Sequence, residues 1–256
     1  MTAKAYATYG AQFAGIYDDL FPQNTITDND IAWLTSHLPR TPGRVVELGA
    51  GTGRVAIPLA KHLADTDALE RFHAVDISPE MVARLDERNT GSIIPVVADI
   101  TTWTPPADND LILCVCATLP MILDPAQQRA TIDAAARSLA PGGRLIIEVH
   151  HDAFVRNLHN QTPDAVIAVP YPGHRQVLVS FMHLEDPHWD VEHRWIDGTQ
   201  MIIAAERSRL TAVDELTSWS TDSGLHRIGV HGSLSGTPLE PTSPVAVVVF
   251  ERPTDP

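Results

Sequence analysis

Three glycines at alternate positions join an apolar strand to a helix near residue 50. The segment reads Val45-Val46-Glu47-Leu48-Gly49-Ala50-Gly51-Thr52-Gly53-Arg54. Glycine is needed where the backbone takes φ > 0 or approaches a ligand more closely than a Cβ atom permits, and the following helix presents N–H groups without helical partners. We therefore expect a ligand on this turn. The residues expected around it are Gly49, Ala50, Gly51 and Gly53.

Acidic residues end the first three predicted strands. Glu47 stands two residues before the first glycine, where its carboxylate would repel a pyrophosphate but suits a ligand with an ammonium group. Asp76 closes the second strand, and a carboxylate there can accept hydrogen bonds from both hydroxyls of a ribose. Asp99 closes the third strand, where it can accept from an adenine amine beside an apolar wall. These three acids favour a nucleoside that carries an ammonium group.

The glycine turn also fits a dinucleotide-binding pattern. Residues 51–56 match G-x-G-x-x-A, and Asp76 follows Ala56 by 20 residues, which is the spacing of an NAD site. An NAD-dependent oxidoreductase is therefore an alternative that the turn by itself does not exclude.

The joint pattern resembles the class I S-adenosylmethionine-dependent methyltransferases over roughly residues 44–149. The matching stretches are Glu47–Gly53, Asp76–Met81, Ala98-Asp99 and Leu139–Ile147. The resemblance implies an α/β fold with a seven-stranded, mostly parallel, doubly wound, Rossmann-like sheet. It also implies that the last strand, Val245–Glu251, runs antiparallel between its neighbours. More narrowly, the N-terminal helices and a later antiparallel insertion resemble those of natural-product methyltransferases acting on small molecules, including N-methyltransferases of amino sugars and glycopeptides.

The resemblance implies S-adenosyl-L-methionine as the cofactor and a set of residues that hold it. The predicted set is Glu47, Gly49, Ala50, Gly51, Gly53, Asp76, Ile77, Asp99, Ile100 and Cys116. Within this set the glycines are expected to contact the methionine portion, Asp76 the ribose, and Asp99 with Ile100 the adenine.

Methyl transfer to nitrogen or oxygen requires in-line positioning, which can supply roughly 7–11 kcal/mol, and a group that takes the proton of the acceptor. His150 and His151 directly follow the fifth strand, at the sheet edge where ligands bind in open α/β folds. Strand alternation lets at most one of them face the cleft, and either can instead be a packing or surface residue.

Tyr17 is the third candidate, on a helix that could close over the cofactor. Its alternative role is a core aromatic beside Phe13 and Phe21. Without a defined base, a non-catalytic module that binds the cofactor and acts with a partner chain is a further alternative.

Thr118, Tyr17 and His183 are the predicted contacts of the acceptor. Thr118 follows the fourth strand, and His183 lies with His188 and His193 on the predicted insertion. The alternative for these three histidines is that they are solvated strand residues. No spacing in the chain matches a strong metal-ligand motif, so no metal is predicted.

Composition and charge limit the class of partner. The chain has 256 residues, with 18 Lys and Arg against 32 Asp and Glu, a formal net charge of −14. Nucleic acids and anionic membranes need a basic surface, so neither is expected as a partner. The N-terminal sequence resembles no secretion signal and no apolar run is long enough for a membrane span, which predicts a cytoplasmic protein with a small-molecule acceptor. A homodimer is left open.

The two cysteines, Cys114 and Cys116, lie two apart in an apolar run and are expected to be reduced and to share one face of a strand.

Short apolar runs alternate with amphipathic segments from residue 44 to 149, as in βαβ units. The predicted strands here are Arg44–Leu48, Phe72–Val75, Ile93–Ala98, Leu111–Val115 and Arg144–Val149. The predicted helices are Arg54–Leu63, Pro79–Arg88 and Pro125–Leu139.

Further elements are predicted on both sides of this core. They are helices Ala11–Leu20 and Asn29–Leu38, insertion strands Gln176–His183, Asp190–Ile196 and Gln200–Arg209, helix Thr211–Ser223 with Thr211 as its N-cap, and final strands Leu225–Val230 and Val245–Glu251. The expected division is a helical cover over 1–40, a cofactor-binding core over 41–150, an antiparallel insertion over 151–210, and a C-terminal helix with a β-hairpin over 211–256.

Overall fold

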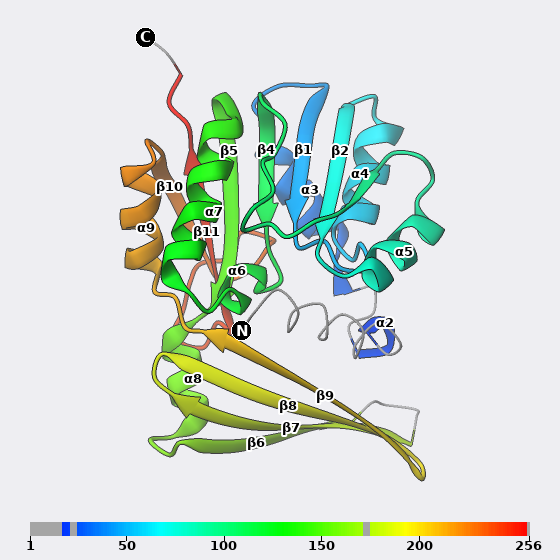
Figure 1. The fold of residues 1–256 in the computed structure, drawn as a ribbon, viewed down its shortest axis with the longest axis vertical. Helices are drawn as coiled ribbons and strands as arrows, with labels where there is room; N and C mark the ends of the chain where they lie inside the picture. Colours follow the sequence, from blue (N-terminus) through cyan, green and yellow to red (C-terminus); the bar gives the residue numbers. More distant parts are fainter. Residues whose placement is uncertain (1–16, 21–24, 171–174, 255–256) are drawn as a thin grey trace.

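The computed structural model describes residues 17–20, 25–170 and 175–254, which contain two β-sheets (Figure 1). The larger sheet has seven strands in the order β10-β11-β5-β4-β1-β2-β3. Their bounds are β1 Gly43–Leu48, β2 Leu69–Asp76, β3 Ile94–Val97, β4 Asn109–Cys114, β5 Leu139–His150, β10 His226–His231 and β11 Val245–Glu251. The first five strands pair in parallel, and β11 runs antiparallel between β5 and β10. This confirms the predicted fold class.

Helices cover both faces of the larger sheet because its strands are apolar on both sides. Neighbouring residues of β1 show this: Val45 packs into the core beneath α3 and α4, whereas Val46 packs into the core beneath α7 and α9. The bounds of the helices around the sheet are α3 Asp28–Ser36, α4 Ala56–Asp65, α5 Pro79–Arg88, α6 Thr118–Met121, α7 Pro125–Ser138 and α9 Val213–Asp222. None of the helices in the described ranges has the length and apolarity needed to cross a membrane.

The second sheet is antiparallel, with the strand order β6-β7-β8-β9. Its strands are β6 Asp164–Pro170, β7 Gln176–Glu185, β8 His188–Asp197 and β9 Gln200–Arg209. It follows α8, Asp152–His159, and lies across the end of the larger sheet near α6 and α2, Tyr17–Leu20 (Figure 1). The sequence predicted three of the strands but missed α8 and β6. The edge strand β6 is mostly exposed. Its sequence does not alternate between apolar and polar residues, so the usual pattern of a half-buried strand is absent.

Two local predictions differ from the structure near the ends of the chain. The predicted helix Ala11–Leu20 lies mainly outside the described residues, which contain only its last turn. The N-cap of α9 is Ala212 rather than Thr211. The Thr211 hydroxyl instead donates a hydrogen bond of 2.9 Å to the buried Gln128 side chain, which links the start of α9 to α7. The prediction of Thr211 as a cap was wrong because this tertiary partner competes for its hydroxyl.

Candidate active site

The glycine turn after β1 has the backbone conformation that only glycine adopts readily. Gly49, Gly51 and Gly53 have φ angles of +75°, +55° and +85°. A Cβ atom on Gly49 would lie 2.2 Å from the Thr118 side chain, whereas one on Gly51 would meet nothing within 4 Å. Gly49 is therefore required by packing. Gly51 faces an open cradle that a side chain would fill.

Asp76, at the end of β2, is held by the glycine turn itself. The Gly51 amide donates to its Oδ2 atom at 2.8 Å, and the Ser78 amide donates to its Oδ1 atom at 2.9 Å. Burial raises the pKa of Asp76, and these backbone hydrogen bonds oppose that rise. The Ile77 amide is a third backbone donor to this carboxylate, and the acceptor capacity that is left on it faces the pocket, where a hydroxyl group could donate to it.

Asp99 follows β3 in a short turn that fixes its orientation. Its Oδ1 atom accepts hydrogen bonds from the backbone amide and the hydroxyl of Thr101, at 2.9 and 2.7 Å. Because both hydrogen bonds use one oxygen, the carboxylate is oriented by its own turn and can present Oδ2 to a ligand.

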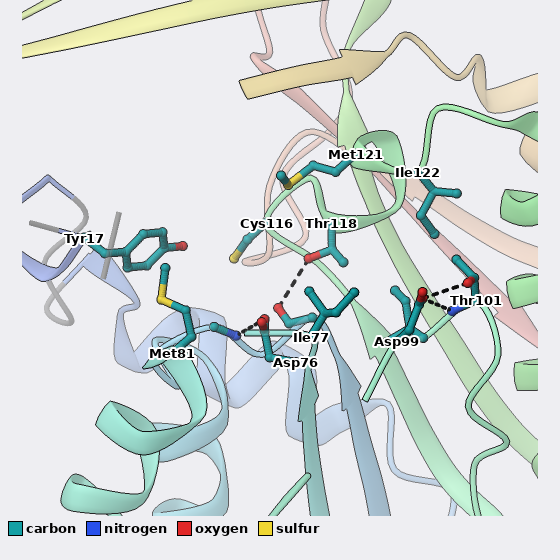
Figure 2. Close-up of a pocket in the computed structure, with 13 residues that line it drawn as sticks. Tyr17, Asp76, Ile77, Met81, Asp99, Thr101, Cys116, Thr118, Met121 and Ile122 are labelled. Atoms are coloured by element: carbon teal, nitrogen blue, oxygen red, sulfur yellow. Dashed lines mark hydrogen bonds between the residues drawn. The ribbon is translucent and has the colours of Figure 1, made fainter. Parts of the chain in front are cut away.

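A pocket joins these elements at the carboxyl ends of β1 to β4 (Figure 2). Its empty volume is about 780 Å³, including space open to solvent, which is in the range of small-molecule sites. The lining residues are Tyr17, Gly49, Gly51, Asp76, Ile77, Met81, Asp99, Ile100, Thr101, Cys116, Thr118, Met121 and Ile122. Four of them, Met81, Thr101, Met121 and Ile122, were not predicted from the sequence. The last two come from α6 and the residue after it, a single turn without any sequence periodicity.

Glu47 is not among the residues that line this pocket, and it hydrogen-bonds to the backbone at the start of α4 instead. Its side chain is 2% exposed, and the Ala56 amide hydrogen-bonds to its carboxylate. Burial raises the pKa of Glu47 to about 8, against the opposing effect of the nearby Arg54 guanidinium. Ala50 and Gly53 also lie outside the residues that line the pocket.

Arg54 and the buried Glu148 form a charged pair that was not predicted from the sequence. The Arg54 guanidinium hydrogen-bonds to the side chains of Tyr17 and Cys116. The Glu148 carboxylate accepts the amides of Cys116 and Ala117, and burial raises its pKa to about 7. Burial also keeps the Tyr17 pKa above its ordinary value, so its hydroxyl stays protonated at neutral pH. The only sequence signal for Arg54 was its place at the end of the glycine turn.

The two cysteines do not share a face of β4, contrary to the prediction. Cys114 packs into the core beneath α7 and α9, whereas Cys116 packs against the core on the opposite side of the sheet and lines the pocket. The reason is that β4 ends at Cys114 and the backbone of Cys116 turns to a φ of +56°, which breaks strand alternation. Neither cysteine forms a disulfide.

The three predicted histidines lie outside the residues that line the pocket. His150 packs edge-on against Trp189, with ring centroids 4.9 Å apart, and burial lowers its pKa. The His151 Nδ1 atom lies 3.0 Å from the Ser243 carbonyl oxygen. His183 is half exposed on β7, and its Nδ1 atom lies 2.8 Å from the carboxylate of Asp164.

Comparison with known families decides between the alternatives that the glycine turn leaves open. Residues 45–143 match the family model described as a methyltransferase domain. The chain is an S-adenosylmethionine-dependent methyltransferase. The matched region spans β1 to the start of β5 and thus includes the glycine turn, Asp76 and Asp99. The oxidoreductase alternative is set aside by this match.

Similar proteins extend the resemblance to nearly the whole methyltransferase chain. Cypemycin N-terminal methyltransferase of a Streptomyces species is 26% identical over 87% of this chain and 88% of its own. The structure of the CcbJ methyltransferase from Streptomyces caelestis has a TM-score of 0.82 at 22% identity, covering 96% of this chain and 98% of that one. The S-adenosylmethionine-bound structure of CalS10, an amino pentose methyltransferase from Micromonospora echinaspora, has a TM-score of 0.70 at 18% identity, covering 93% and 96%. The fold is therefore shared along the chain, including the second sheet.

Proposed function

We propose that this methyltransferase transfers the methyl group of S-adenosylmethionine to a nitrogen or oxygen atom of a small-molecule acceptor in secondary metabolism. The observation that carries the proposal is the pocket at the carboxyl end of the sheet, where the Gly51 cradle, two oriented carboxylates and apolar walls meet. When bound, the cofactor supplies a methyl group on a positively charged sulfur. The chain has to bind the cofactor, position the acceptor and exclude water.

The residues present fit this cofactor from end to end. Gly51 is proposed to face the methionine portion, because its cradle is open and its amide is already held by Asp76. Asp76 is proposed to bind the two ribose hydroxyls, and Asp99 the adenine amine between Ile77 and Ile100. Glu47 would act through the turn that it supports rather than by direct contact.

Tyr17 is the side chain best placed to meet the acceptor. It enters the pocket from α2, and its hydroxyl points inward above Met81 (Figure 2). Arg54 hydrogen-bonds to the Tyr17 side chain, which holds the phenol at this edge of the pocket. Thr118 is bound to the Val115 carbonyl at 2.9 Å, so it shapes the wall of the pocket beside Gly49. His150 and His151 would act only by supporting the second sheet and α8.

The names of two relatives favour an acceptor that carries an amino group. One is an N-terminal methyltransferase and the other an amino pentose methyltransferase. Both fit a small or peptidic acceptor rather than a nucleic acid, in agreement with the net charge of −14.

The test is methyl transfer by the full chain from methyl-labelled S-adenosylmethionine. Amino sugars, short peptides and phenols are offered in parallel with DNA, transfer RNA and a protein extract. We expect S-adenosylhomocysteine to form and the label to enter a small molecule. Label in nucleic acid or large protein, or no S-adenosylhomocysteine with any acceptor while the cofactor binds, would contradict the proposal.

A further inference from the structure

Strand β5 extends past the point where its neighbour β4 ends, and Glu148 stands at that point. The parallel pairing of the two strands ends at Cys114 and Ile147. Glu148 is the next residue of β5, where it pairs with Val247 of β11 and is 8% exposed. A carboxylate buried to this degree costs free energy unless hydrogen bonds satisfy it.

The chain that leaves β4 turns sharply at Cys116 and Ala117, which both have a φ angle of +56°. Residues with a Cβ atom rarely adopt this left-handed conformation, and two in succession persist only where their surroundings hold them. The Glu148 carboxylate accepts hydrogen bonds from the amides of both residues. The Arg54 guanidinium adds a hydrogen bond to the Cys116 side chain. The Cys116-Ala117 turn is therefore held by a residue of β5 that is distant in the sequence.

The Cys116-Ala117 turn carries one wall of the pocket. Cys116 lines the pocket itself, and α6 begins directly after Ala117 with the lining residues Thr118 and Met121 (Figure 2). The Thr118 hydroxyl lies 3.3 Å from the Gly49 carbonyl oxygen, and its side chain occupies the space that a Cβ atom on Gly49 would need. A displacement of the Cys116-Ala117 turn would therefore move this wall relative to the glycine turn after β1.

We propose that Glu148 is a positioning residue for methyl transfer, which holds the Cys116-Ala117 turn so that Cys116, Thr118 and Met121 contact the bound cofactor. Glu148 is not among the residues that line the pocket, so it acts through the turn rather than by direct contact. The inference rests on the cofactor position in the proposed function. It requires an acceptor oxygen at the correct reach rather than a negative charge, because one carbonyl oxygen has two lone pairs for the two amides.

Two variants of Glu148 separate reach from charge. Glu148→Gln keeps the length of the side chain and an acceptor oxygen but loses the negative charge. Glu148→Asp keeps the charge but withdraws both oxygens by one methylene group. Isothermal titration calorimetry of the full chain measures the affinity for S-adenosylmethionine. We expect this affinity to stay within threefold of wild type in Glu148→Gln and to fall at least tenfold in Glu148→Asp.

The control is the same shortening at the other end of the sheet, Glu251→Asp. Glu251 pairs with Arg144 at 3.0 Å near the start of β5, and neither residue lines the pocket. This variant should keep the wild-type affinity within twofold. An affinity within threefold of wild type in Glu148→Asp, or a tenfold loss in Glu148→Gln, would overturn the proposal.

The position of the wall is measured at Met121, in the ligand-free protein. The chain has five methionines, so labelling their methyl groups with carbon-13 gives a simple spectrum. The Met121 signal is assigned from its loss in Met121→Leu. We expect this signal to shift by more than its linewidth in Glu148→Asp and to stay in place in Glu148→Gln and Glu251→Asp. A general loss of stability would not produce this pattern, and an unmoved signal in Glu148→Asp would also overturn the proposal.

The outcome is separable from that of the proposed function. If Asp76→Ala weakens cofactor binding and Glu148→Asp does not, the role of Glu148 is wrong and the cofactor position stands. If neither variant weakens binding, the proposed cofactor position is wrong and the inference fails with it. Methyl transfer to nucleic acid or large protein, with both variants weakened, would contradict the proposed function and leave the role of Glu148 standing.

Discussion

The backbone amide of Gly51 donates a 2.8 Å hydrogen bond to the Oδ2 atom of Asp76. This bond joins the turn after β1 to the end of β2, so the open space in front of Gly51 and the carboxylate that we propose binds the ribose are held in one fixed arrangement. A ligand that spans both positions meets a preformed surface and loses little free energy in ordering it.

Replacement of Asp76 should affect cofactor binding strongly. In Asp76→Ala we expect the affinity for S-adenosylmethionine to fall more than tenfold, about 1.4 kcal/mol, through loss of charge-assisted hydrogen bonds to the ribose. Isothermal titration calorimetry measures this directly. Asp65→Ala, which removes an exposed partner of Lys61 on α4, should keep the wild-type affinity. An unchanged affinity in Asp76→Ala would remove this residue from the proposed site.

Two glycine variants separate the cost of backbone strain from the effect of a side chain in the open space beside Gly51. Gly51→Ala and Gly91→Ala both place a Cβ atom on a residue with positive φ and with nothing within 4 Å. Each should lower the free energy of unfolding by about 1–2 kcal/mol, because alanine resists this conformation. Only Gly51→Ala should also weaken binding of S-adenosylmethionine, since Gly91 is not among the pocket residues. Equal affinities in the two variants would show that the cradle does not face the cofactor.

The buried Glu47 should make the stability of the ligand-free protein depend on pH. Its pKa of about 8 in the folded chain exceeds the ordinary value of 4.5, so between these pH values the folded state retains a proton that the unfolded state has lost. The free energy of unfolding therefore decreases as pH rises, with a limiting slope of about 1.4 kcal/mol per pH unit from this group. Glu47→Gln should make the decrease between pH 6 and 8 less steep in urea unfolding experiments.

The comparison for this pH effect is Glu87→Gln, at an exposed position on α5. This variant should follow the wild-type dependence on pH. If Glu47→Gln also follows it, the carboxyl of Glu47 is not protonated in the folded protein near neutral pH.

Arg54 should be needed for stability because it is the cation beside two buried carboxylates. Arg54→Met removes the guanidinium cation from beside Glu47 and Glu148. We expect the free energy of unfolding at pH 8 to fall by about 3–5 kcal/mol. Adding Glu148→Gln should recover part of the loss, because the neutral amide needs no counter-ion.

The control for Arg54→Met is the same substitution at an exposed arginine, Arg129→Met. Arg129 pairs with Asp222 at 3.1 Å on the exposed sides of α7 and α9, and its loss should cost about 0–1 kcal/mol. Chemical denaturation compares the two arginines. Similar small losses would show that the buried carboxylates do not depend on Arg54.

The order and type of the core elements were predictable because local patterns determine them. Helix α5 was predicted at its observed bounds, since Ser78 caps it and Pro79 begins it. The final strand, Val245–Glu251, was likewise predicted at its bounds, being a short apolar run. β6 and α6 were missed because one is an exposed edge strand and the other a single turn that is stabilised by its surroundings.

By itself, the sequence determined the glycine turn, the acids after β2 and β3 and the parallel core, because backbone conformation and strand burial follow from residue type at short range. Only the tertiary structure decided what those residues face. It left Glu47 outside the residues that line the pocket and brought the Arg54 guanidinium close to both Tyr17 and Glu148. These relations join residues far apart in the chain, and their free energy comes from burial and charge in the folded state, which no short stretch of sequence encodes.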